Sequence, residues 1–221
     1  MSAPRPYPVR LDGELDPQTS RWLWLVKWLL IIPHAILLAF LWLAMIVTTV
    51  VAGFTILFTG RYPRGIFDFN VGVLRWTWRV SYYSYSALGT DRYPPFSLGE
   101  EPDYPATLQI EYPQQLSRGL VLVKWWLLAL PHYLIIGLFT GGAHAGGGGL
   151  VTILVLIAAV ILLFTRTYPQ SIFDLVMGMN RWSYRVMGYA LLMTDEYPPF
   201  RLDMGGQDQA PSPGATFGKK L

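Results

Sequence analysis

The sequence predicts a mainly α-helical, polytopic membrane protein built by tandem duplication. Of its 221 residues, 52% are hydrophobic and only 14% are charged, against about 25% charged residues in ordinary globular domains. Two long blocks contain no Asp, Glu, Lys or Arg, one between Lys27 and Arg61 and one between Lys124 and Arg166. Each block exceeds the roughly 20 residues that span a bilayer core as a helix. Finally, the string TDRYPPF at 90–96 returns as TDEYPPF at 194–200.

The repeated string closes each copy of a longer unit. YPVRL and YPATL open the two copies, and SRWLWLVKWLLIIPH is matched by SRGLVLVKWWLLALPH. LFTGRYPRGIFDF then returns as LFTRTYPQSIFDL, and GVLRWTWRV as GMNRWSYRV. Shared order along the chain indicates an internal duplication. We therefore divide the chain into an N-terminal tail, repeat 1, a linker, repeat 2 and a C-terminal tail that its Gly, Pro, Ser and Gln content predicts to be disordered, at 1–6, 7–98, 99–103, 104–202 and 203–221.

Each unit begins with a predicted short strand. In TLQIEY, the apolar residues Leu108, Ile110 and Tyr112 alternate with polar ones, which is the period of a half-buried strand. VRLDGE is the weaker counterpart in repeat 1.

The apolar block follows the strand. In repeat 2 the glycine-rich run TGGAHAGGGG at 140–149 separates Arg118–Phe139 from Leu150–Thr165, because glycine is a poor helix former and a good connector. In repeat 1 one helix from Trp22 to Thr59 would be about 57 Å long, well over a bilayer core of about 30 Å. Either a tight hairpin turns near Leu41–Leu43, or an interfacial segment up to Pro33 precedes one tilted span. Repeat 2 favours hairpins, and hence four transmembrane helices.

The basic residues favour the same topology. If each block is a hairpin, all 17 lysines and arginines lie on one side of the membrane, as the positive-inside rule expects. Single crossings would place seven of them on the opposite side. The first 20 residues are polar and proline-rich, so no cleaved signal peptide is expected. The sequence thus predicts a multi-pass protein of the inner, cytoplasmic membrane with both termini in the cytoplasm.

A polar stripe marks the next predicted helices, which run from about Ile66 to Leu88 and from Ile172 to Leu192. The stripe helices are amphipathic and carry two arginines each, which makes a full span expensive, so we expect them flat on the cytoplasmic interface. Two interpretations of the stripe stand level: internal salt bridges with helix-dipole stabilisation by the aspartates, or a site for anionic headgroups or a partner's carboxylates. The candidate lipid- or partner-binding residues are Asp68, Arg75, Arg79, Asp174, Arg181 and Arg185.

Four further polar residues fall within the apolar blocks. His34 and His132 each follow a proline, and they are either a proton relay or metal pair, or neutral histidines bonded to a carbonyl that the proline frees. The second interpretation is favoured, and His144 is expected to be an ordinary loop residue. Lys27 and Lys124 are expected to extend toward lipid phosphates. No metal site, cofactor or catalytic motif is predicted.

LLIIPH, LFTGRYPRGIFDFNVGVLRWTWRV and DRYPPF together resemble a group of bacterial membrane proteins catalogued as domain-of-unknown-function family 4389. The resemblance covers the chain from Tyr7 to Leu202. It implies an integral membrane protein and carries no activity or ligand with it.

The leading functional hypothesis is a non-enzymatic scaffold or accessory subunit at the cytoplasmic face. Its expected partners are membrane lipids, anionic ones among them, and membrane proteins or further copies of the chain, with no nucleic acid. A small oligomeric transporter or channel is the alternative, because internal repeats are common in transporters. A membrane enzyme acting on lipid headgroups ranks third.

Overall fold

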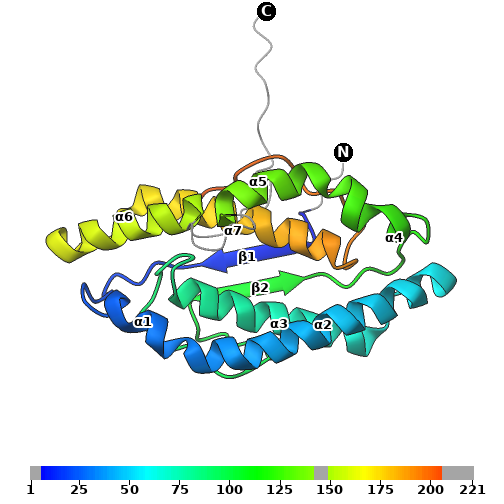
Figure 1. Cartoon of the computed structure of the whole chain (residues 1–221), viewed down its shortest axis with the longest axis horizontal. Helices are drawn as coiled ribbons and strands as arrows, with labels where there is room; N and C mark the ends of the chain where they lie inside the picture. The colour runs from blue at the N-terminus through cyan, green and yellow to red at the C-terminus, as the bar shows by residue number, and fades with distance from the viewer. Residues whose placement is uncertain (1–5, 142–148, 206–221) are drawn as a thin grey trace, which may run out of the picture.

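The computed structural model describes residues 6–141 and 149–205. Its centre is a two-stranded antiparallel sheet of β1 (Val9–Gly13) and β2 (Ala106–Ile110). The strands pair so that Leu11 faces Leu108, and these two leucines hold equivalent places in the two repeats. The predicted strands are therefore confirmed, and their pairing relates the two copies by an approximate two-fold axis through the sheet (Figure 1).

Helices flank this sheet along both of its edges (Figure 1) and cover one of its faces, on which Leu11 and Leu108 are buried, while Arg10 and Gln109 on the opposite face are exposed. α3 (Arg64–Tyr83) borders β2 and α7 (Gln170–Ala190) borders β1. Each of these helices therefore lies against the strand of the other repeat, and Figure 1 shows the two strands lying between them. The Arg75 Nε donates to the Leu108 oxygen at 3.0 Å, and the Arg181 Nε donates to the Leu11 oxygen at 2.8 Å. The repeats are thus interlocked through exchanged strands.

The predicted hairpin in repeat 1 is wrong. α2 (Ile32–Thr59) is one helix of 28 residues and passes through Leu41–Leu43 unbroken, because the sequence Leu-Trp-Leu contains no residue that stops a helix. The break falls earlier, between α1 (Trp24–Leu30) and α2, just before Pro33, which has no N–H to donate. α2 ends at Gly60, whose φ of 72° is the left-handed cap that glycine favours. The chain turns back only there, and α3 forms the returning arm.

The second apolar block repeats this plan with two insertions. The first is a single residue, since Pro131 lies seven residues after Lys124 whereas Pro33 lies six after Lys27. A π-helical turn, η1 (Lys124–Leu128), lies between α4 (Leu120–Val123) and α5 (Leu130–Thr140). One extra residue in a helix is what a π-turn accommodates.

The second insertion is the glycine-rich segment. It separates α5 from α6 (Leu150–Thr165) as predicted, but it does not reverse the chain. A Cβ on Gly149 would meet the Gly141 nitrogen at 2.2 Å, so α6 begins where α5 ends, and in Figure 1 it extends beyond α5 instead of folding back along it. The buried positions of α2 recur in α6 after a constant 106 residues: Met45, Ala52 and Ile56 correspond to Val151, Ala158 and Leu162. Together α5 and α6 are the counterpart of α2.

α3 and α7 confirm the predicted amphipathic helices in their residue ranges, but the prediction that they lie on the membrane surface is wrong. Both are buried along most of their length, and Trp78 and Phe173 are among the fully buried side chains. They form the core of the molecule and do not lie flat on a surface. The apolar outer layer is instead made by α1, α2 and the α4–α6 segment.

In the described residues, α2 is the one helix long and apolar enough to cross a membrane. The segment Leu120–Leu128 and α5 would make a second candidate span if counted as one helix bent by 43°. α6, with 16 residues, is shorter. The predicted loop tip at His144 and most of the predicted C-terminal tail lie outside the described residues.

Candidate functional site

Each repeat contains one buried lysine held by the repeated heptapeptide. The Lys27 side chain has no exposed surface, and its Nζ donates to the Thr90 oxygen at 2.7 Å and lies 2.9 Å from the Asp91 carboxylate. The same ammonium lies 4.5 Å from the centre of the Tyr83 ring, within the range of a cation–π contact. The lysine is therefore neutralised by its own chain.

Repeat 2 reproduces this geometry. The Lys124 Nζ donates to the Thr194 oxygen at 2.9 Å and to Asp195 at 2.7 Å, and Tyr189 supplies the ring, at 5.5 Å. Contrary to expectation, neither lysine extends toward lipid phosphates. Asp91 and Asp195 were missed by the sequence analysis, although both copies of the heptapeptide contain the Thr-Asp pair.

The histidines lie in a second site built from the same motif. The Trp76 Nε1 donates to the His34 Nδ1 at 3.0 Å, and the Phe96 ring stacks on the imidazole with centroids 3.9 Å apart and planes 14° apart. Because Nδ1 accepts this hydrogen bond, the neutral ring carries its own hydrogen on Nε2. That Nε2 is buried and has no partner among the described residues.

His132 has the same environment in repeat 2. The Trp182 Nε1 donates to its Nδ1 at 3.0 Å, and Phe200 stacks at 4.2 Å. Its Nε2 is also buried without a partner among the residues described. Two copies of this arrangement in one chain indicate that it belongs to the repeat itself.

The carbonyls freed at the helix breaks are satisfied by tyrosine and not by histidine. The Tyr93 hydroxyl donates to the Leu30 oxygen at 3.0 Å, and the Tyr197 hydroxyl donates to the Leu128 oxygen at 3.1 Å. The heptapeptide thus has three roles: Thr-Asp holds the lysine, Tyr caps the open carbonyl, and Phe stacks on the histidine. The heptapeptide occurs twice because each repeat has one helix break, and each copy of the heptapeptide binds the groups exposed at that break.

The arginine stripes point inward to main-chain oxygens. Arg79 donates to the Ser97 oxygen and, at 3.1 Å, to the Gly99 oxygen, and burial lowers the pKa of Arg79 below its usual value. Arg75 lies 2.5 Å from the Glu100 carboxylate. All of these oxygens belong to the segment that follows the heptapeptide.

In repeat 2 the corresponding segment is the end of the described chain. Arg181 donates to the Asp203 and Gly205 oxygens at 2.7 and 2.6 Å, and Arg185 lies 2.5 Å from the Asp203 carboxylate. These contacts support the structural interpretation of the stripe.

Asp68 and Asp174 lie apart from these arginine contacts. Asp68 pairs with the exposed Arg64 at 3.2 Å, and Asp174 accepts from Gln170 at 2.7 Å. Both lie in the second turn of their helices, beyond the first turn in which the helix dipole favours a carboxylate, so the predicted dipole stabilisation is not supported. In the described residues, no group of three or more His, Cys, Asp or Glu could hold a metal ion.

A comparison with family models decides the classification. The model of the domain of unknown function DUF4389 matches residues 21–97 and 147–201, which include both heptapeptides and more than half of the chain. The chain belongs to the DUF4389 family. Both lysine-holding Thr-Asp pairs and both stacking phenylalanines of this DUF4389 protein fall in the matched segments. No curated protein and no solved structure matches the chain.

Proposed function

We propose that this DUF4389 protein is a membrane-embedded, non-enzymatic scaffold or accessory subunit that docks lipids or partner proteins at the cytoplasmic face. The carrying observation is the outer face of α2. Phe40 and Phe58 are 69% and 73% exposed, and aliphatic side chains between them are similarly exposed. The core helix of a soluble protein would bury such residues.

The exposed apolar surface continues beyond α2. Trp125 and Trp126 of η1, Leu134 and Leu138 of α5, and Phe164 of α6 are all exposed. Contiguous apolar patches larger than a few hundred Å² mark interaction or membrane surfaces. Because this apolar surface extends over several helices, a lipid bilayer is the environment that would cover it best.

The arrangement of elements supports embedding along the membrane plane instead of the four crossings expected from the sequence. α2, α3, both strands and α7 run along the same long axis of the molecule (Figure 1). A crossing orientation would therefore place a two-stranded sheet and the arginines of α3 and α7 at hydrocarbon depth. Open sheet edges and charges are costly there. Embedding in the plane leaves the core and both termini on one side, the cytoplasmic side favoured by the basic residues.

The polar residues support a structural role over catalysis. The buried cations Lys27, Lys124 and Arg79 are bound to oxygens of the chain itself. Each contact fastens the loop after the heptapeptide, or the heptapeptide itself, to a helix. Such groups position a rigid surface for docking.

Depth measurements test the embedding. Phe40, Val47 and Phe54 lie seven residues apart on the exposed face of α2, and the chain has no native cysteine. A fluorophore on a single cysteine at each position should be quenched equally by a shallow lipid-borne quencher, while one at Asp103 stays aqueous. Much deeper burial of position 47 than of 40 and 54 would instead mean that α2 crosses the bilayer.

The scaffold role has its own test. A preparation from bacterial membranes in mild detergent should retain lipid or a stoichiometric partner. A preparation that retains neither would count against docking, even if the embedding is correct.

A small transporter or channel is the second candidate, and it is favoured by the Nε2 atoms of His34 and His132, which have no hydrogen-bond partner within residues 6–141 and 149–205. Ion or proton flux in proteoliposomes that disappears on His34→Ala and His132→Ala would reverse the ranking. The proposal of a scaffold expects no flux from the unaltered protein.

A further inference from the structure

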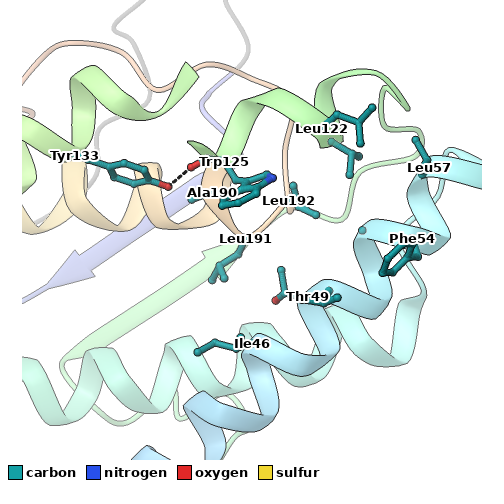
Figure 2. A pocket seen from close by; sticks show the side chains of 13 residues that line it. Ile46, Thr49, Phe54, Leu57, Leu122, Trp125, Tyr133, Ala190, Leu191 and Leu192 are labelled. Carbon is teal, nitrogen blue, oxygen red and sulfur yellow. Dashed lines mark hydrogen bonds between the residues drawn. The ribbon is translucent and has the colours of Figure 1, made fainter. Parts of the chain in front are cut away.

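A groove interrupts the exposed apolar surface between the two repeats. It encloses about 600 Å³. Figure 2 shows Ile46, Phe54 and Leu57 of α2 on one side, with Leu122, Trp125 and Tyr133 from the second apolar block opposite. Leu191 and Leu192, which follow α7, lie between them.

The lining leaves little for a polar ligand to bind. Its side-chain hydroxyls come from Thr49 and Tyr133. The Thr49 oxygen accepts from Asn70 at 3.2 Å, and the Tyr133 hydroxyl donates to the Trp125 oxygen at 2.5 Å. Apolar walls with engaged hydroxyls favour a hydrocarbon occupant.

One end of the groove is basic. Arg61 lies four residues after Leu57, and Arg118 lies four residues before Leu122. A Cβ on Gly60 would lie 3.6 Å from the Arg118 Nε, so the two chain segments meet at this end. Both arginines are exposed, and neither forms an ion pair with another residue in the described part of the chain. Guanidinium groups bind phosphate oxygens in pairs.

The groove is not duplicated residue for residue. Val121 on its wall corresponds to Trp24 in repeat 1, since both lie three residues before the buried lysine. A tryptophan at this place is much larger than valine. Because the two copies differ at this position, the smaller side chain of Val121 leaves the groove open on the side of repeat 2.

We infer that the groove binds one acyl chain of an anionic phospholipid, with the lipid phosphate held by Arg61 and Arg118. The site rests on the proposed function, because the groove opens on the face that the bilayer would cover. Charge complementarity identifies the headgroup, and the apolar lining identifies the chain. Binding here would place an ordered lipid between α2 and η1 and join the two repeats on their membrane side.

The groove is tested by a pair of matched substitutions. Val50 lines it and Val47 does not, yet both lie on α2 and are 55% and 56% exposed. Val50→Trp should fill the groove and lower retention of phosphatidylglycerol by about tenfold in native mass spectrometry, a difference of about 1.4 kcal/mol. Val47→Trp should stay within about twofold of the unaltered protein. Equal retention by the two variants would overturn the site.

The headgroup contact is tested by comparing lipids that have the same acyl chains and differ only in their headgroups. Arg61→Gln with Arg118→Gln should abolish the preference for phosphatidylglycerol over phosphatidylcholine of the same acyl chains, a loss of about fivefold for each arginine. Arg10→Gln, an exposed strand residue, should leave the preference intact. A preference that survives the double substitution would overturn the assignment of the phosphate.

Vesicle flotation distinguishes failure of the proposed membrane embedding from failure of the groove assignment. If the proposed embedding fails, the unaltered protein does not float with phosphatidylglycerol vesicles. If only the groove assignment fails, the protein floats and Val50→Trp retains lipid as well as Val47→Trp does. Val121→Trp provides a second way to fill the groove, and its lipid retention should fall as that of Val50→Trp does.

Discussion

The carboxylate of Asp91 lies 2.9 Å from the ammonium group of Lys27, and that ammonium group has no exposed surface. The two residues are 64 positions apart in the sequence. Their contact fastens the heptapeptide to the start of the apolar block, and Lys124 and Asp195 do the same in repeat 2. Stability should therefore depend strongly on these pairs.

Replacing Lys27 by Met should reduce the free energy of unfolding by about 3 kcal/mol, because Asp91 would lose its cation in a largely buried place. Chemical unfolding in detergent micelles measures this. The exposed pair of Arg64 and Asp68 provides the control, since Arg64→Gln should cost only about 0.3 kcal/mol. Similar losses for both substitutions would contradict the buried role of Lys27.

Trp76→Phe should cost about 1 kcal/mol, because it removes the donor to the His34 Nδ1 and leaves that atom unsatisfied. Trp182→Phe should cost a similar amount in repeat 2. Thermal unfolding checks both, with the exposed Trp22 replaced by Phe as the control. If all three variants unfold at the same temperature, the indole hydrogen bonds contribute nothing.

The exchanged strands predict that neither repeat folds alone. As monomers, residues 1–98 and residues 99–221 should each be protease-sensitive, because α3 would lack β2 and α7 would lack β1. Co-expressed, the two halves should purify as a 1:1 complex. A stable monomer of residues 1–98 would show that the exchange is dispensable.

Deleting residues 141–148 should preserve the fold, because it would join α5 to α6 in the way that α2 is continuous in repeat 1. The change in unfolding free energy should be within about 1 kcal/mol, because changing the length of a connecting segment alters the closure entropy only slightly. Deleting eight residues within α2, 41–48, should abolish folding. Circular dichroism and size-exclusion chromatography distinguish these outcomes.

Substitutions in the arginine stripe distinguish its structural role from the lipid-binding role proposed for the groove. Replacing Arg75, Arg79, Arg181 and Arg185 by Gln should lower stability by several kcal/mol, since hydrogen bonds to charged groups contribute about 1.5–3 kcal/mol each. Under conditions in which the variant stays folded, its lipid retention should match that of the unaltered protein. A selective loss of anionic lipid with normal stability would restore the stripe as a lipid site.

Local patterns in the sequence predicted the individual elements well. Alternation located both strands, the polar stripes located α3 and α7, and the glycine-rich run located the gap between α5 and α6. These features depend on residues close in the chain. The predicted hairpin turn at Leu41–Leu43 is wrong because it rested on bilayer thickness, on the comparison with repeat 2 and on the distribution of basic residues, whereas nothing in that stretch disfavours a helix.

Contacts between residues far apart in the sequence could not be predicted from these local patterns. Periodicity shows that α3 has a polar stripe with Arg75 and Arg79, but it does not show what covers that stripe. In the structure the Ser97 and Gly99 carbonyls do so. The pair of Lys27 and Asp91 was not predicted for the same reason, because Lys27 was explained as a side chain extending toward lipid phosphates and Asp91 only as part of the repeated heptapeptide.

The facing of Leu11 and Leu108 bears on how such a chain could arise. A protein with a single copy of the unit would have to pair its strand with that of a second molecule, and the antiparallel register about equivalent leucines allows this without change. Gene duplication and fusion through residues 99–103 would turn that dimer into one chain. The fused partner would then be present at the high effective concentration that a short linker gives. The two halves would also be free to diverge, so that one could keep Val121 while the other carries Trp24.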